Sequence, residues 1–344
     1  MDSMTRYAAI DIGSNAVRLL LAMVSEEEFG LRVKKISWMR MPIRLGEDAF
    51  LQGMISDERA CKLTKTMGGF AKLIDAYQPV AVKACATSAM RSAQNGRQVC
   101  RRIKEQAGID IEIINGRQEA RYLFQNRHKI MTSSEKAALF VDVGGGSTEI
   151  TLFCDGRVQA SRSFNLGTIR LLNNRARQQD WDLMKSWLKK ITRGHEPVEA
   201  IGSGGNINQL FKLAKGRPGT WVSRKKIKKI RDELAAYPLE ERMRRFYLKP
   251  DRADVIIPGA RIYIKAMTWG RCEKIHVPMQ GLADGIIRVL HDQRVQAQSM
   301  ETQIYVPAIE PALADNPFQQ AGLGDRQSFP AAFHSKIAAG NHYA

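Results

Sequence analysis

Cysteines are few in this sequence of 344 residues, and they are scattered singly along the chain. The five cysteines include no C-x-x-C pair, which argues against a structural zinc site and against a framework of disulfides. Isolated cysteines of this kind are typical of a reducing compartment. We therefore expect a cytoplasmic protein.

Long apolar runs are missing as well. No stretch of about 18 or more apolar residues occurs, so the sequence predicts no membrane-spanning helix and no membrane partner. The first residues lead into a strand-like apolar segment without the apolar core of a signal peptide, so we expect no secretory signal. The hydrophobic content of 44% is still sufficient for packed cores.

Acidic residues are scarce relative to basic ones. The 35 Asp and Glu residues stand against 53 Lys and Arg residues, which gives a net charge of +18. Such an excess predicts a polyanionic partner: nucleic acid, inorganic polyphosphate, a phosphorylated nucleotide or an anionic membrane. Aromatic residues make up only 7% of the chain and are not interleaved with the basic runs. Because zinc-finger and basic-zipper patterns are also missing, a nucleic-acid partner is disfavoured.

The stretch over residues 137–153 carries the strongest functional signal. Five apolar residues lead to Asp142, and three glycines, Ser147-Thr148-Glu149 and a second apolar run follow. An apolar run bounded by glycines predicts a buried strand, a tight turn and a returning strand. Residues without Cβ let backbone N–H groups approach an anion, and a carboxylate beside that anion requires a cation or a water between them. The pattern suggests a metal-assisted phosphate site, with a plain hairpin as the alternative.

A second copy of this pattern occurs near the N-terminus. Residues 7–21 again form an apolar run that ends in Asp11 and is followed by Gly13, Ser14 and a returning apolar run. Two such units in one chain predict two similar halves that face one cleft.

Two further segments could contribute polar groups to that cleft. A helix is expected over 56–77 and a buried strand over 80–86, which leads towards Arg91, whose planar guanidinium could bind phosphate oxygens. An Asn-Gly pair at 115–116 signals a turn and places Glu119 in the first turn of the next helix. Acidic residues favour helix N-termini in any case, and Arg91 could equally be a surface residue.

Two later segments are rich in glycine or in basic residues. Residues 202–206 form a strand-to-helix turn that includes Gly204, and helix N–H groups at such a turn can bind an anion. Residues 222–231 contain six basic residues in ten. A basic run is usually a solvated helix face, and the alternative is a track for a chain-like polyanion.

Four segments together resemble the exopolyphosphatase / guanosine pentaphosphate phosphohydrolase (Ppx/GppA) family. They are D-I-G-S-N-A-V-R-L at 11–19, T-S-A-M-R at 87–91, E-A-R at 119–121 and D-V-G-G-G-S-T-E at 142–149. The paired Asp-x-Gly hairpins are also similar to the phosphate-binding turns of the actin, sugar-kinase and heat-shock ATPase superfold. The resemblance implies an α/β protein with two actin-like (ribonuclease H-like) domains and an active-site cleft between them.

The resemblance also implies a set of site residues. Glu119 would be the base that activates the attacking water, with Asp142 as a second catalytic residue. Mg²⁺, or alternatively Mn²⁺, would be held by Asp11, Asp142 and Glu149, whose hard oxygen ligands suit such ions. Phosphate would be bound by residues of both turns and of neighbouring motifs, namely Gly13, Ser14, Asn15, Arg18, Arg91, Gly144, Gly145, Gly146, Ser147, Thr148 and Gly204.

Some positions near the expected cleft match the family and others depart from it. Arg40 and Arg44 precede a Leu-Gly-Glu turn that family members carry near the substrate entrance, and Asp254 matches an Asp that projects toward the cleft. Gln118 stands where a Glu is usual, and Ala283 replaces a frequent Arg, which removes one possible phosphate contact.

The predicted organisation has two domains, over 1–131 and 135–294, joined by a polar linker, and a weakly ordered tail over 295–344. That tail is too short for the helical phosphohydrolase-like domain of the long family members, so we expect the short form. The predicted activity is exopolyphosphatase, which releases terminal orthophosphate from inorganic polyphosphate, and the protein is expected to be a homodimer.

Three other functions stay open from the sequence. A guanosine pentaphosphate 5′-phosphohydrolase would use the same site and would act on an alarmone of the stringent response. A non-catalytic sensor of polyphosphate or of (p)ppGpp belongs to another class, and an actin-like ATPase or sugar kinase is a further alternative.

Overall fold

The computed structural model describes residues 4–28, 30–125, 137–155, 157–195, 198–217 and 219–304, with side chains to residue 299. The chain up to Met300 forms one compact unit. The predicted linker over 130–136 and most of the predicted tail lie outside the described residues. The two domain boundaries therefore stay predictions.

The first part of the chain forms a five-stranded mixed sheet. Its strands are β1 (Thr5–Ile12), β2 (Val17–Glu27), β3 (Gly30–Met41), β4 (Ala81–Ala86) and β5 (Ile111–Ile113). They lie in the order β3-β2-β1-β4-β5, with antiparallel pairing among the first three and parallel pairing from β1 through β4 to β5. The turn between β1 and β2 lies where the sequence predicted it, directly after the apolar run that forms β1.

The second part forms a six-stranded sheet that repeats this hairpin. Its strands are β6 (Ala137–Val143), β7 (Thr148–Cys154), β8 (Arg157–Phe164), β9 (Val198–Ser203), β10 (Trp221–Ser223) and β11 (Lys274–His276). They lie in the order β10-β11-β9-β6-β7-β8, with β6, β9 and β11 parallel. Because β6 and β7 pair as β1 and β2 do, the two hairpins have the same build.

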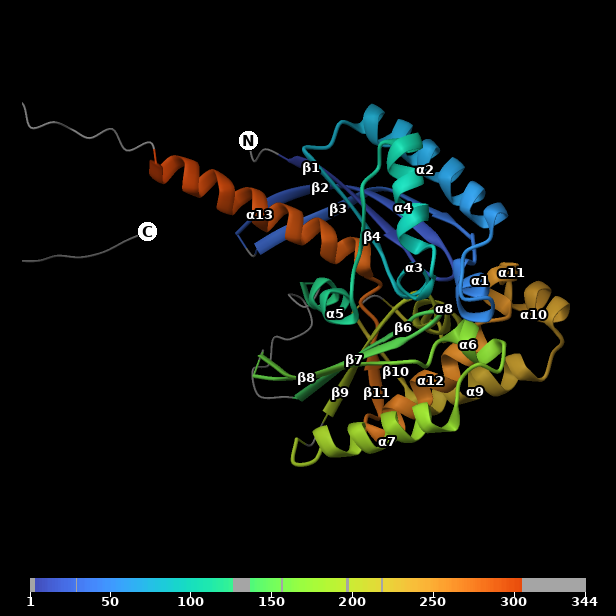
Figure 1. Ribbon diagram of the computed structural model, residues 1–344. Coiled ribbons are helices and arrows are strands. Elements are labelled where there is room, and N and C mark those ends of the chain that lie inside the picture. The colour runs from blue at the N-terminus through green and yellow to red at the C-terminus, as the bar shows by residue number, and fades with distance from the viewer. Residues whose placement is uncertain are drawn as a thin grey trace, which may run out of the picture. The chain divides into compact units, whose positions relative to one another are not determined.

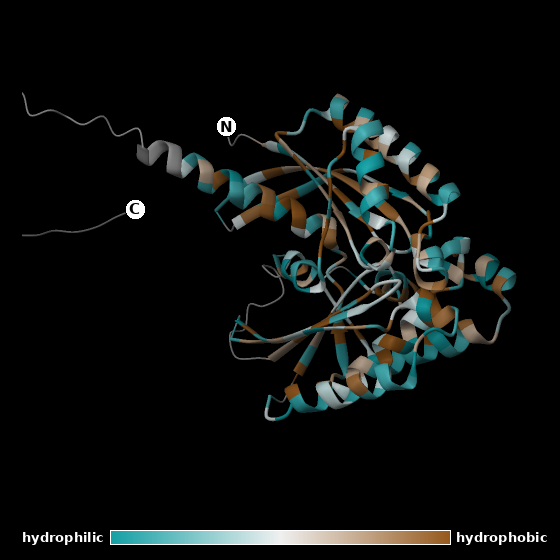
Figure 2. Ribbon diagram, in the orientation of Figure 1, coloured by the Kyte–Doolittle hydropathy of each residue, from teal (hydrophilic) through white to brown (hydrophobic). Residues whose placement is uncertain are grey.

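The helices lie against both sheets (Figure 1). They are α1 (Leu45–Leu51), α2 (Asp57–Tyr77), α3 (Ser88–Ser92), α4 (Gly96–Ala107), α5 (Gly116–Phe124), α6 (Thr168–Leu172), α7 (Gln178–Ile191), α8 (Gly205–Leu213), α9 (Arg224–Ala235), α10 (Leu239–Phe246), α11 (Pro250–Ala253), α12 (Ile256–Trp269) and α13 (Leu282–Ile304). Figure 2 shows teal and brown segments mixed along the helices, and the buried residues of α2 and α12 are mostly apolar, as expected for helices with one apolar face. None of the described helices is long and apolar enough to cross a bilayer.

Helix α13 packs against the first sheet. Its buried Ile287 and Leu290 share a core cluster with Tyr7 of β1. The Tyr7 hydroxyl lies 3.3 Å from Nδ1 of His291, and both side chains are buried. The sequence predicted that this helix ends near His291, but it continues to Ile304. That expectation was wrong because the apolar residues mark only the packed part of the helix, whereas residues 292–299 of its continuation are exposed.

Helix α5 precedes the second sheet in the chain but packs against it. The ring of Phe124 stacks on Phe153 of β7, with centroids 4.1 Å apart and an angle of 7° between the planes. At the other end of the helix, a Cβ on Gly116 would lie 3.1 Å from Cβ of Ser163 on β8. Asn115 caps α5, and the side chain of Gln118 completes the capping box by accepting from the Asn115 N–H at 2.9 Å.

Candidate active site

The two glycine turns meet across the gap between the sheets. The N–H of Gly13 donates to the carbonyl of Ala16 at 3.1 Å, and the N–H of Gly144 donates to that of Ser147 at 2.9 Å. A Cβ on Gly145 would lie only 2.7 Å from Cβ of Ser14, so this approach requires a glycine. The turns therefore face one cavity from opposite sides.

Each turn is held from behind by the first residues of a short helix. The carbonyl of Ser14 accepts from the N–H of Gly46 in α1, and the carbonyl of Gly145 accepts from the N–H of Ile169 in α6, both at 2.8 Å. Since the peptide group is planar and trans, a carbonyl turned outward leaves the next N–H pointing inward. The sequence analysis anticipated neither support, and it interpreted residues 45–47 as a turn rather than as the start of α1.

A packed aromatic ring makes Gly146 sensitive to substitution. A Cβ there would lie 2.0 Å from Cζ of Phe50, and the guanidinium of Arg170 lies 4.3 Å from the centroid of that ring. Gly146→Ala should destabilise the fold by about 1–3 kcal/mol and lower Tm by roughly 2–8 °C, with partial recovery when Phe50→Leu is added. Gly68→Ala is the control, because a Cβ on Gly68 meets nothing within 4 Å. Equal Tm values for the two single variants would contradict the packing argument.

Most of the predicted site residues line a single cavity of about 530 Å³. These are Asp11, Gly13, Ser14, Asn15, Arg18, Glu119, Asp142, Gly144, Gly145, Ser147 and Gly204. Gly204 has a φ of +102°, and a Cβ on it would lie 3.0 Å from Oδ1 of Asp142. Four other predicted residues are not among the described residues that line the cavity: Arg91, Gly146, Thr148 and Glu149.

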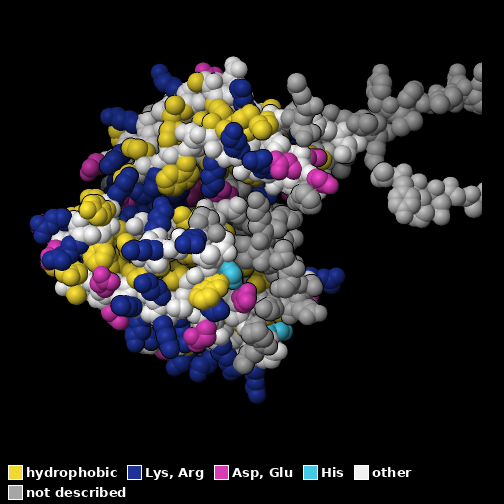
Figure 3. Space-filling model, turned by 180° about the vertical axis from the view of Figure 1, so that it is seen from behind, with side chains coloured by type: hydrophobic (Ala, Val, Ile, Leu, Met, Phe, Trp, Pro, Cys, Tyr) yellow, Lys and Arg dark blue, Asp and Glu magenta, His cyan; other side chains and the backbone are white. Residues whose placement is uncertain are grey.

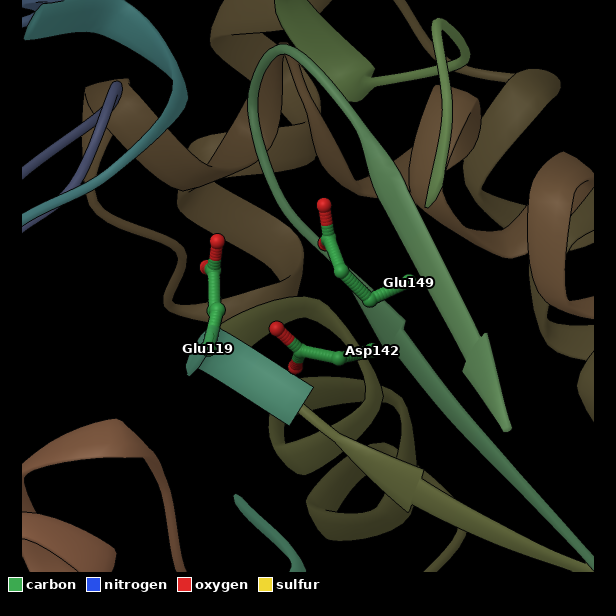
Figure 4. A group of neighbouring side chains, drawn as sticks. All are labelled: Glu119, Asp142 and Glu149. Carbon is green, nitrogen blue, oxygen red and sulfur yellow. The ribbon is translucent and has the colours of Figure 1, made fainter. Parts of the chain in front are cut away.

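Three carboxylates lie close together, two of them on the wall of this cavity (Figure 4). Glu119 comes from α5, Asp142 from the end of β6 and Glu149 from the start of β7, and one oxygen of each lies within 4.8 Å of the others. Asp142 and Glu149 are cross-strand partners in the hairpin register, which fixes their proximity. Arg91 lies close behind, with Nη1 3.8 Å from Oε2 of Glu119.

Burial raises the pKa values of the three carboxyl groups, and repulsion between them contributes to the rise. Burial raises the pKa of Glu119 well above its usual value, and the charges of Glu149 and Asp142 raise it further. The pKa of Asp142 is raised to about 7, mainly by burial and by Glu149, while a hydrogen bond with Ser203 opposes the rise. Burial also raises the pKa of Glu149, although Ser147 and Ser163 donate to its Oε1 at 2.6 and 2.9 Å.

The cluster has the composition of a divalent-cation site. Oε2 of Glu119 and Oε2 of Glu149 are buried and have no hydrogen-bond partner among the described residues. Close carboxylates with raised pKa values and unpaired oxygens fit Mg²⁺ or Mn²⁺, which take oxygen ligands. Asp11, the third predicted ligand, is not one of these three carboxylates, and its cross-strand partner Arg18 pairs with it at 2.5 Å.

The structure adds a cation that the sequence analysis passed over. Arg252 lines the cavity, and its Nη2 lies 2.2 Å from the position of a Cβ on Gly205. It forms no ion pair among the described residues, and burial together with the nearby charges of Arg40 and Arg18 lowers its pKa to about 9. Arg252 lies two residues before Asp254, the residue of this segment for which the resemblance implied a position facing the cleft.

The other charged residues expected near the entrance are paired with one another. Arg40 lines the cavity and forms an ion pair with Asp251 in which both side chains are nearly buried. Arg44 pairs with Asp254 at 2.6 Å and also with Glu47. These contacts join the first sheet's side of the molecule to α11 and to the start of α12.

The fold and the site together define a class: α/β proteins of the actin-like fold in which two hairpin turns and an acidic cluster share one cleft. The model of the Ppx/GppA phosphatase family matches residues 23–293, and the chain belongs to that family. The predicted family and fold class are thereby confirmed.

The relatives agree with this placement. The chain is 24% identical over 333 residues to Exopolyphosphatase 1 of Mycobacterium tuberculosis, covering 89% of this chain and 96% of that protein. It is 27% identical over 278 residues to a bifunctional 3-dehydroquinate synthase/phosphatase of Fusobacterium nucleatum, covering 74% of this chain and 42% of that protein.

Solved structures show the same fold. The Ppx/GppA family member of Aquifex aeolicus matches with a TM-score of 0.69 and 27% identity, over 84% of this chain and 99% of that chain. An exopolyphosphatase of Cytophaga hutchinsonii matches with a TM-score of 0.73 and 23% identity, over 84% of this chain and 98% of that chain.

Proposed function

We propose that the protein is a metal-dependent exopolyphosphatase that releases terminal orthophosphate from inorganic polyphosphate. The observation that carries this proposal is the meeting of two glycine turns at one cavity that Glu119 and Asp142 line, with Glu149 beside them. Turn N–H groups suit the oxygens of a terminal phosphoryl group, and the carboxylates suit a cation and a water beside it. The names of the mycobacterial relatives support the same substrate.

The residues of this chain divide the chemistry between them. The N–H groups of the two turns bind and orient the terminal phosphoryl group. Glu119, whose pKa is raised, takes a proton from the water that attacks phosphorus. The bridging P–O bond breaks, and the shortened chain leaves with the bridging oxygen. Bound Mg²⁺, held by Asp142 and Glu149, would neutralise charge on the phosphate oxygens.

Arg252 would bind phosphate oxygens further along the substrate. Its lowered pKa and its position among Arg40 and Arg18 indicate a positive site that an anion would stabilise. Arg252→Ala should raise KM for polyphosphate by about 10–100-fold with a smaller change in kcat, and Arg252→Lys should recover part of the loss. Arg244→Ala, at an exposed position of α10, is the control. An unchanged KM in Arg252→Ala would remove this residue from the substrate site.

The function is tested by comparing three substrates. Orthophosphate release should be fast from long-chain polyphosphate, slower from guanosine pentaphosphate and negligible from ATP, and EDTA should abolish it. ADP release from ATP would instead indicate an ATPase or kinase. Binding of polyphosphate without turnover would indicate a sensor.

Guanosine pentaphosphate is a second candidate substrate because of two aromatic side chains. Trp38 on β3 and Tyr247 after α10 both line the cavity and are 50% and 93% exposed. An exposed aromatic ring can stack on a nucleobase. If guanosine pentaphosphate is the substrate, Trp38→Ala or Tyr247→Ala should raise its KM and leave that for polyphosphate unchanged.

A further inference from the structure

The basic run over 222–231 leads from β10 into α9, a helix of the second sheet's side. Ile227 and Ile230 are buried in the core of that side, so the apolar residues of the run face inward. The lysines between and before them, Lys225, Lys226, Lys228 and Lys229, are exposed. Among the described residues, those that line the active-site cavity include none from α9. The catalytic proposal therefore leaves this run without a role.

The four exposed lysines of α9 carry unneutralised charge. The arginines at either end of the run are paired, Arg224 with Glu273 at 2.5 Å and Arg231 with Asp232. In the part of the chain that the structure describes, no ion pair involves any of the four lysines. On neighbouring α12, by contrast, the ammonium of Lys265 lies over a tryptophan ring.

The placement of these charges opposes the stability of their own helix. The first turn of α9 holds no acidic residue but includes Lys225 and Lys226, where the helix dipole disfavours cations. Helix α7 has the favourable arrangement, with Asp180 in its first turn and Lys189 and Lys190 in its last. Like charges on one face of α9 add repulsion. A bound anion would reduce both the unfavourable interaction with the helix dipole and the repulsion among the lysines.

Three of the α9 lysines line a groove on the surface, and α9 adjoins a helix that reaches the cavity. Lys225, Lys228 and Lys229 line one groove whose other lining residues are Asp232 and Glu233, and α9 is about 18 Å long. Helix α8 packs against α9, and its exposed Lys212 lines the active-site cavity. Figure 3 shows Lys and Arg side chains over both halves of the face that it draws, including the half built on the second sheet.

We propose that Lys225, Lys226, Lys228 and Lys229 form an α9 exosite that binds the distal phosphates of a long inorganic polyphosphate chain. The exosite rests on the proposed function, since the terminal phosphate of the same chain would lie in the cavity. Linear phosphate fits better than nucleic acid, because Trp221 on adjoining β10 already carries the ammonium of Lys274 at 3.9 Å from its ring centroid. That contact occupies the ring face on which a base would stack.

The test compares two triple variants with the same loss of charge. Lys225→Gln/Lys228→Gln/Lys229→Gln removes the exosite, and Lys185→Gln/Lys189→Gln/Lys190→Gln removes three exposed lysines of α7 as the control. For a long polyphosphate chain, the exosite variant should raise KM about tenfold at low salt and reduce the slope of log KM against log salt by about 2. Its kcat, and its KM for tripolyphosphate, should stay within about twofold of the parent values, because a short substrate does not reach α9.

Several results would overturn the exosite. An unchanged KM for the long chain would do so, and so would equal increases in the two triple variants, which would indicate general electrostatic attraction. Weaker binding of duplex DNA without weaker binding of polyphosphate in the exosite variant would assign the surface to nucleic acid.

A binding measurement separates the exosite from catalysis. Fluorescence anisotropy of labelled long polyphosphate in EDTA reports binding without turnover. If the parent protein fails to hydrolyse polyphosphate but loses anisotropy-detected binding when the α9 lysines are replaced, the proposed function fails while the exosite stands. If hydrolysis is normal and this binding is independent of α9, the exosite fails alone.

Discussion

Replacing Glu119 by Gln is expected to lower kcat for polyphosphate hydrolysis by about 10³-fold, which is typical of removing a general base. The amide keeps the shape of the side chain but cannot accept the proton of the attacking water. Binding should be retained, because the turns that hold the phosphate are not altered. The measurement is orthophosphate release under single turnover, combined with the Kd for polyphosphate.

Glu105→Gln is the matched control for this prediction, since Glu105 is an exposed residue of α4. It should leave both kcat and Kd unchanged. Substantial turnover by Glu119→Gln would show that another group accepts the proton, and a large loss of binding would place Glu119 in substrate recognition instead.

Asp142→Asn is expected to have an effect of similar size for a different reason. The carboxylate lies within the acidic cluster, and its loss should remove a ligand of the proposed Mg²⁺ and lower kcat by about 10³-fold. Added Mg²⁺ should raise Tm of the parent protein, because an ion that binds the folded state stabilises it, and should not raise Tm of the variant. A normal Mg²⁺-dependent rise in the variant would exclude Asp142 from the ion site.

In EDTA the same substitution should make the protein more stable at high pH. The pKa of Asp142 is about 7 in the folded protein but near 4 in an unfolded chain. The folded state therefore binds more protons between these values, and its stability falls as pH rises from about 4 to 7 and stays reduced above. Asn carries no charge, so the gain in Tm, on the order of 5 °C, should appear at pH 8 and vanish near pH 4.

Asp75→Asn serves as the control for the pH dependence, because Asp75 is an exposed residue of α2. Its Tm should follow that of the parent protein at both pH values. A lower Tm for Asp142→Asn at pH 8 in EDTA would mean that the carboxylate stabilises the metal-free fold.

The local parts of the fold could be predicted from the sequence. The apolar runs around Asp11 and Asp142 gave both hairpins, because each strand pairs with its neighbour in the chain across a glycine turn. The helix expected over 56–77 is observed as Asp57–Tyr77, with the side chain of Ser56 accepting from the N–H of Arg59 as its cap. Glu119 could be placed at a helix start for the same local reason.

The division of roles between the two hairpins could not be predicted from their similarity. Asp11 and Asp142 hold equivalent positions, but their cross-strand partners are Arg18 and Glu149. One pair is neutralised within the hairpin, and the other is a pair of acids with raised pKa values. The difference depends on strand register, which the repeated motif alone does not specify.

Contacts between distant segments account for what the sequence analysis missed. The supports of the turns join Ser14 to Gly46 and Gly145 to Ile169, and no local periodicity marks these residues as partners. Arg252 belongs to the site because the chain returns to the cavity after α9 and α10, beside Gly205. Neither the supports of the turns nor the position of Arg252 can be predicted from the sequence until the arrangement of the two sheets is known.

The packing of α5 against β7 and β8 determines which parts of the fold form the proposed ion site and which form the proposed phosphate site. Because Phe124 stacks on Phe153 of β7, the helix that carries Glu119 packs against the sheet that carries Asp142 and Glu149. The glycine turns, in contrast, belong to different sheets and would separate if the sheets rotated apart. The proposed ion site therefore depends on residues packed on one sheet, whereas the proposed phosphate site depends on both sheets.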